Sequence, residues 1–128
     1  MRLLLDTHAL IWWFMGDETL TKPAREAIAE EANEIFVSAA SAMEISTKHR
    51  LGKLPEAGLL ATDLGAFVRE QGFTELPISI EHAAMAGNLA IAHKDPFDRF
   101  LIAQSLVENV PLVSNEALFD GFGVNRFW

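Results

Sequence analysis

The stretch RLLLDTHALIWWFM, residues 2–15, joins a short apolar run to a longer apolar segment. Residues 2–5 have the length and composition of a buried β-strand, and residues 7–15 are predicted to form a helix. A strand that leads at once into a helix is the repeating unit of α/β proteins. Because the same alternation continues along the chain, we expect an α/β fold with a central, mostly parallel sheet flanked by helices.

The remaining elements follow the same rhythm. Strands are predicted at residues 34–37, 74–78 and 111–114, with an edge strand at 124–127. Helices are predicted at residues 21–32, 39–51, 62–71, 80–89, 96–109 and 115–121. We find no internal repeat, linker or change of composition, so we expect one domain over residues 1–128.

Composition excludes several classes of protein. Half of the 128 residues are hydrophobic, which argues against disorder. The net charge of −8 argues against a passive nucleic-acid binder, because such proteins carry a basic face. The chain has no Cys, which excludes disulfides, thiol nucleophiles and Cys-ligated metals. With no bilayer-length apolar run and no signal-peptide layout, we expect a cytoplasmic protein that does not enter a membrane.

Acidic residues recur near the predicted strand ends. Asp6 follows the first strand directly, Glu44 lies in the helix after the second, and Glu116 stands two residues beyond Ser114. Asp98 opens the helix that leads into the strand at 111–114. Ligands of parallel sheets bind at the carboxyl ends of the strands, so the four acids are expected to converge there. Carboxylates without Cys or paired His select Mg²⁺ or Mn²⁺, and such ions can activate water against a phosphodiester.

Each acid also has a purely structural explanation. Asp6 can cap the helix that follows it, although Thr7 could do so instead. Glu44 can pair with Lys48 four residues on. It also completes a capping-box pattern, although Ser38 is the more natural cap of that helix. Glu116 would be an ordinary acid in the first turn of a short helix. These alternatives remain open at the level of sequence.

The stretch HKDPFDRFLIAQ, residues 93–104, contains two aspartates with different expected roles. Pro96 fits the first helical position, which makes Asp95 the natural N-cap. Asp98 then lies in the first turn, where the helix dipole favours the ionised form that a metal ligand requires. We therefore predict that Asp95 is the cap and Asp98 the ligand.

Basic residues are few, and six of the ten flank these acids in sequence. They are Arg2, Lys48, Arg50, Lys53, Lys94 and Arg99. This arrangement fits phosphate binding beside a metal site, although a solvated helix face is the better explanation of any single one. The H-x-x-x-H zinc pattern, a glycine-rich phosphate loop and the G-x-S-x-G serine elbow are all missing. A receiver-like phosphoacceptor is also discounted, because Asp6 lacks an acidic neighbour.

Four stretches closely resemble the ordered motifs of PIN domains, and more narrowly those of VapC-type toxins of bacterial toxin–antitoxin pairs. They are LLLDTHALIWW, VSAASAMEISTKHRLGKL, HKDPFDRFLIAQ and PLVSNEALF. The resemblance implies a PIN-like three-layer fold and metal-dependent hydrolysis of RNA. It also implies a homodimer and an antitoxin that blocks the site.

The same resemblance implies a role for each acid. Asp6, Glu44 and Asp98 match the first three acids of the family's metal site. The fourth acid is usually Asp, whereas this chain has Glu116. A longer side chain makes a water-mediated contact plausible, so Glu116 is expected to matter less. The alternative function is a non-catalytic PIN-like module that binds a partner or nucleic acid.

The first predicted helix is apolar almost all the way round. A helix of this kind is buried on more than one side. One sheet face covers a single side, so we expect part of this helix to lie under the antitoxin. Complete burial of Trp12 and Trp13 within one protomer would exclude that expectation.

Overall fold

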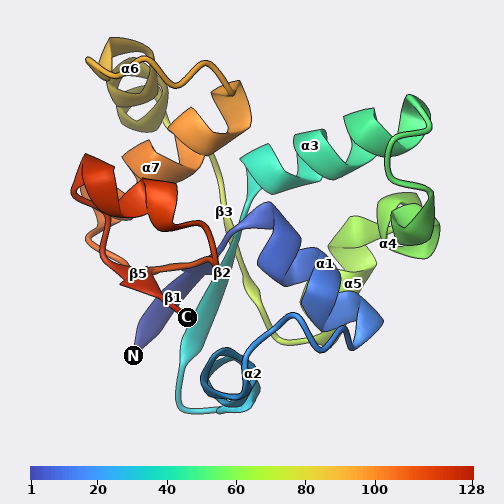
Figure 1. The fold of residues 1–128 in the computed structure, drawn as a ribbon. Coiled ribbons are helices and arrows are strands. Elements are labelled where there is room, and N and C mark those ends of the chain that lie inside the picture. Colours follow the sequence, from blue (N-terminus) through green and yellow to red (C-terminus); the bar gives the residue numbers. More distant parts are fainter.

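The computed structural model describes residues 1–128 and contains one sheet of five parallel strands, in the order β3-β2-β1-β4-β5 (Figure 1). The strands are β1 (Arg2–Leu5), β2 (Glu34–Ser38), β3 (Thr74–Leu76), β4 (Leu112–Val113) and β5 (Arg126–Phe127). The chain adds β2 and β3 on one side of β1 and then returns to its other side with β4 and β5. The carboxyl ends of β1 and β4 therefore meet where the direction of winding reverses, which is where such sheets bind ligands.

Helices connect and cover the strands. The α-helices are α1 (Thr7–Met15), α2 (Lys22–Ala29), α3 (Ala39–Arg50), α4 (Gly58–Thr62), α5 (Leu64–Glu70), α6 (Ile80–Asn88) and α7 (Pro96–Glu108). Two 3₁₀ segments, η1 (Pro55–Ala57) and η2 (Ala117–Phe122), complete the structure. None of the helices combines the length and the apolar composition needed to cross a membrane.

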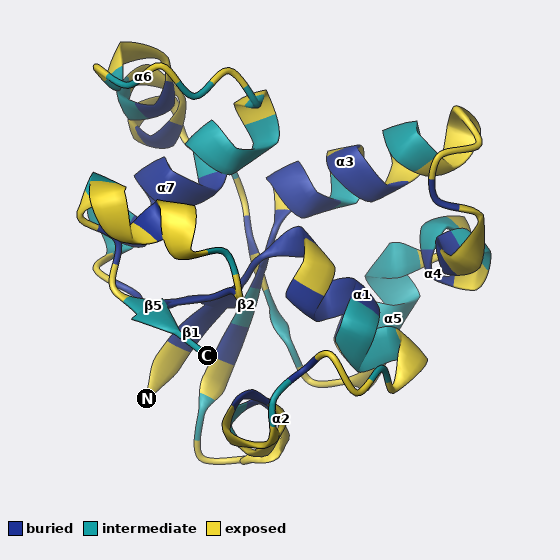
Figure 2. Ribbon diagram, in the orientation of Figure 1, coloured by how far each residue is buried: buried dark blue, intermediate teal, exposed yellow.

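The alternation of side chains along β1 divides the core in two. Leu3 and Leu5 are buried in a cluster with residues of α1 to α5. Leu4 points to the opposite face, into a cluster with Leu101 of α7 and Phe119 of η2. The buried strands consequently lie between two layers of helices (Figure 2). On the side that contains α7, helix α6 packs against α7. This is the expected three-layer α/β arrangement.

Helix α3 begins and ends at caps that the sequence predicts. The side chain of Ser38 accepts a hydrogen bond from the N–H of Ala40, so Ser38 caps α3 as expected. At the end of that helix, Gly52 adopts φ +74°, a conformation that favours glycine. The helix predicted at 21–32 ends earlier, at Ala29.

Two segments differ from the sequence-based expectation. Residues 55–62 form η1 and α4, although the sequence predicts no element before residue 62 in this segment. Pro55 and Gly58 interrupt the pattern, while burial of Ala57 and Leu60 in the core stabilises the turns. The short helix predicted at 115–121 is the 3₁₀ helix η2 at residues 117–122. All five strands run parallel, which confirms the expected mostly parallel sheet.

Candidate active site

Asp6 lies directly beyond β1 and is 4% exposed. Its Oδ1 accepts a hydrogen bond of 2.7 Å from the N–H of Ala9, so Asp6, and not Thr7, caps α1. Burial raises the pKa of Asp6 to about 6, while hydrogen bonds from Ser114 and Ala9 oppose the rise. Ser114 follows β4, the neighbouring strand, and thus belongs to the same site. Asp6 therefore caps α1 and also belongs to the candidate site.

Glu44 projects from the second turn of α3 and is also 4% exposed. Its Oε2 lies 2.5 Å from Nζ of Lys48. This is the ion pair, four residues apart on one helix, that the sequence offered as the structural explanation of Glu44. A buried hydrogen bond of 3.0 Å between the hydroxyls of Thr7 and Ser41 joins the start of α1 to α3. This bond holds the elements that carry Asp6 and Glu44 against each other.

Asp98 lies in the first turn of α7. Its N–H and that of Phe97 donate to Oδ1 of Asp95, over 3.2 and 2.9 Å, which confirms that Asp95 is the cap. Oδ2 of Asp98 lies 2.7 Å from Nε2 of His93. Burial raises the pKa of Asp98, the hydrogen bond with His93 opposes it, and the charges of Asp95 and Glu116 raise it further.

Glu116 precedes η2 and is partly exposed. Its N–H donates to the hydroxyl of Ser114 over 3.0 Å. Its Oε1 lies 3.7 Å from Nδ1 of His8, which stacks on Trp12. Burial is the main cause that raises the pKa of Asp6 and of Asp98. The charge of Glu116 raises both pKa values further, by a smaller amount. Glu116 therefore lies within electrostatic reach of two of the other acids.

Asp6 and Asp98 both lie within electrostatic reach of Glu116, and Glu44 stands on α3, which is in contact with α7 (Figure 1). No three His, Asp or Glu side chains are close enough to form a ready-made metal site. Glu44 is held by Lys48 and Asp98 by His93. A metal ion would therefore have to replace these partners at Glu44 and Asp98.

The chemistry of the donor set fits a hard cation. The raised pKa values of Asp6 and Asp98, caused first by burial, show that their negative charges are poorly compensated. All four donors are carboxylates, which Mg²⁺ and Mn²⁺ prefer over softer ligands. Asp6, Glu44 and Asp98 are the residues that would hold such an ion, with Glu116 at the edge of the group.

Two of the six basic residues that flank the acids in sequence do not serve phosphate binding in the structure. The guanidinium of Arg99 donates to the carbonyls of Ala86, Gly87, Leu89, Ile91 and His93. Arg2 lies at the opposite, amino end of β1, where it donates to the carbonyl of Glu108. Arg99 is consequently a structural residue, and Arg2 lies away from the acids.

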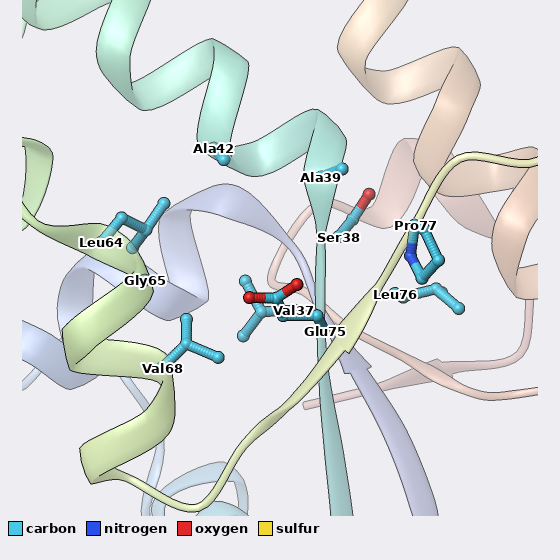
Figure 3. Close-up of a pocket in the computed structure, with 10 residues that line it drawn as sticks. All are labelled: Val37, Ser38, Ala39, Ala42, Leu64, Gly65, Val68, Glu75, Leu76 and Pro77. Atoms are coloured by element: carbon cyan, nitrogen blue, oxygen red, sulfur yellow. The ribbon is translucent and has the colours of Figure 1, made fainter.

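A cavity of about 220 Å³ lies next to β2 and β3 but is separate from the acids. Leu64 and Val68 of α5 face Val37 and Glu75 of the strands across it (Figure 3). Most of its lining is apolar, and none of the four candidate acids contributes to it. This cavity is therefore not the metal site.

A comparison with protein families matches the PIN domain model to residues 3–123. The chain belongs to the PIN domain family. Its fold is similar to that in the crystal structure of VapBC2 from Rickettsia felis bound to a DNA fragment from their promoter. The TM-score is 0.68 at 17% identity, over 95% of this chain and 93% of the other. FitAcB from Neisseria gonorrhoeae gives a TM-score of 0.64 at 19% identity, over 98% and 96%. No curated protein matches in sequence.

The structure adds His8, which the sequence did not single out, to the candidate site, where it reaches Glu116. His93, which flanks Asp95 and Asp98 in the sequence, reaches Asp98. The position of His8 two residues after Asp6 offered only a weak signal. Trp12 and Trp13 are partly exposed rather than fully buried, so antitoxin coverage of α1 stays a prediction.

Proposed function

We propose that this PIN domain, acting as one nuclease domain over residues 1–128, is a Mg²⁺- or Mn²⁺-dependent endoribonuclease. The observation that carries the proposal is the burial of two carboxylates, Asp6 beyond β1 and Glu44 on α3, whose elements are joined by the hydrogen bond between Thr7 and Ser41. Burial of carboxylates on adjoining elements is unfavourable unless a cation compensates them. A nuclease of this class uses that cation in its reaction.

In this proposal each acid has a stated part. Asp6, Glu44 and Asp98 would hold the metal, and Glu116 would orient a water molecule at the edge of the site. Such an ion would supply activation of water at neutral pH and compensation of charge on the phosphodiester. Asp6 needs to be ionised to bind the ion, so metal binding should weaken as the pH falls towards its pKa of about 6.

Incubation of the purified protein with total RNA tests this function. We expect cleavage with Mg²⁺ or Mn²⁺, loss of cleavage on chelation, and recovery when the metal is restored. Asp98→Asn serves as the matched inactive control, and mapping of the cut ends defines the sequence that is recognised. Single-stranded DNA of the same sequence shows whether the 2′-hydroxyl is required. Cleavage that survives chelation would contradict the proposal.

A non-catalytic, partner-binding PIN domain is the second candidate. The engagement of Glu44 by Lys48 and of Asp98 by His93 favours it, because both acids already have cationic or hydrogen-bonding partners. Absence of cleavage together with retained RNA or partner binding would support this candidate over the first.

We further propose that the protein is the toxin of a cytoplasmic toxin–antitoxin pair and forms a two-fold homodimer. The sequence motifs of VapC-type toxins support this, as does the fold shared with VapBC2. Trp12 and Trp13 are partly exposed on α1, and Met15 is 44% exposed, which provides an apolar surface for the antitoxin. Light scattering at micromolar concentration should give the mass of a dimer. Co-expression with the antitoxin should abolish cleavage, and Trp12→Ser should weaken that inhibition.

A further inference from the structure

Lys48 forms an ion pair that differs from an ordinary pair on a helix surface. Its Nζ lies 2.5 Å from Oε2 of Glu44, whose side chain is only 6% exposed, while that of Lys48 is 38% exposed. The pair between Lys22 and Glu26 in α2 has the same spacing, yet it is 3.8 Å long and highly exposed on both sides. Lys48 thus compensates a charge that is largely buried.

Helix α3, which carries Lys48, is in contact with α7, which carries Asp98. The pKa of Lys48 is raised, first by its hydrogen bond to Glu44 and then by the charges of Glu44, Asp95 and Asp98, while desolvation opposes the rise. Lys48 is therefore bonded to the second acid of the candidate site and lies within electrostatic reach of the third.

Two other basic side chains next to Asp98 already have partners. Arg99 uses its guanidinium on five backbone carbonyls, and His93 is bonded to Asp98. The lysine ammonium is a point charge on a flexible four-carbon stem, and here its end is partly in solvent. Lys48 can therefore change partner without unfolding the backbone around it.

We propose that Lys48 acts as an internal cation that holds Glu44 and then transfers to a phosphate of the RNA once Glu44 binds a divalent ion. The inference rests on the proposed function of the site. Two cations on one carboxylate repel each other, so Glu44 releases the ammonium when it takes up the ion. The anion best placed to receive it at the mouth of the site is the phosphodiester of the substrate.

Opposite effects on metal binding and on RNA follow from this exchange. Lys48→Met removes the competing charge and should strengthen Mn²⁺ binding by about threefold or more, measured by calorimetry on the full chain without RNA. Lys48→Gln, which can still donate a hydrogen bond to Glu44, should do the same if the methionine variant folds poorly. Lys48→Arg keeps the charge and should resemble the wild type. Lys22→Met is the matched control and should change neither property.

The RNA arm uses a single-stranded RNA at saturating Mn²⁺. Lys48→Met and Lys48→Gln should raise KM or lower kcat by about tenfold, and Lys48→Arg should recover much of the loss. Mn²⁺ affinity that is unchanged or weaker in both uncharged variants would overturn the role of Lys48 as a competing cation. Tighter Mn²⁺ binding with unchanged KM and kcat would overturn its role at the phosphate.

Failure of the proposed function gives a different result. If the wild type cuts no RNA, the nuclease proposal fails, and fluorescence anisotropy with the same RNA replaces the kinetic arm. Equal RNA affinity of Lys48→Met and Lys22→Met would then overturn the phosphate contact. The calorimetric comparison with Mn²⁺ still decides the competition at Glu44.

Discussion

The backbone N–H of Asp98 donates a hydrogen bond of 3.2 Å to the side chain of Asp95, so the first aspartate caps the helix on which the second is displayed. Oδ1 of Asp95 is occupied by backbone groups of α7. The carboxylate of Asp98 is instead hydrogen-bonded to His93, and the charge of Glu116 raises its pKa, after burial as the main cause. Two acids three residues apart therefore have separable effects.

Substitution should separate them. Asp95→Ala removes the cap and should lower the free energy of unfolding by about 0.5–2 kcal/mol while most of the cleavage rate remains. Asp98→Asn should abolish cleavage and leave the metal-free fold at least as stable, because it removes one carboxylate from a crowded group. Melting curves and cleavage rates measured on the same preparations test both statements. An inactive, well-folded Asp95→Ala beside an active Asp98→Asn would reverse the two roles.

The pKa of Asp6 predicts how stability depends on pH. The folded-state pKa of about 6 exceeds the ordinary value of 3.8, so the folded state binds the proton more tightly than the unfolded state does. Stability contributed by this group is present below about pH 4 and is lost as the pH rises through about 6. Asp6→Asn retains a capping side chain and should stabilise the metal-free protein at pH 7 by as much as about 3 kcal/mol. Urea denaturation should show this difference shrinking towards pH 4.

Asp120 provides the control for that measurement. Its exposed carboxylate is bonded to Arg126, and this hydrogen bond lowers the pKa of Asp120. The sign is therefore opposite, and Asp120→Asn should not stabilise the protein at pH 7. Stabilisation by both substitutions would point to the net charge of the protein rather than to burial of Asp6.

Glu116 should contribute less to activity than Asp6 does. It is partly exposed, and its carboxylate lies 3.7 Å from His8 rather than in a buried position. Glu116→Gln should lower kcat by a smaller factor than Asp6→Asn, measured with saturating Mg²⁺ and one RNA. Equal losses would show that Glu116 is a full metal ligand.

Arg99 should matter through the segment that precedes α7. Its guanidinium reaches five carbonyls between Ala86 and His93, and the single ammonium of a lysine cannot span them. Arg99→Lys should cost on the order of 2–3 kcal/mol and accelerate amide hydrogen exchange around residues 89–94. Arg25→Lys, which alters an arginine bonded to the carbonyls of Asp17 and Leu20, is the control. Unchanged exchange in Arg99→Lys would argue against this structural role.

Much of the fold follows from interactions within a few residues of the chain. The apolar run at residues 2–5 becomes β1, and the caps Ser38 and Asp95 begin α3 and α7 where the sequence places them. These features depend on side-chain periodicity and on local hydrogen bonds, which can be predicted without knowledge of distant residues. The presence of acids near strand ends can be predicted in the same way.

Tertiary structure decided which distant groups meet. The order β3-β2-β1-β4-β5 places Ser114 beside Asp6, a neighbourhood that no local pattern specifies. It also decided that Arg99 binds backbone carbonyls and that Arg2 lies at the far end of β1, against the grouping suggested by sequence. Long-range contacts depend on the path of the chain across the sheet and on the desolvation that packing imposes. Burial, unlike charge, is a property of the folded molecule, and it is burial that raises the pKa of Asp6.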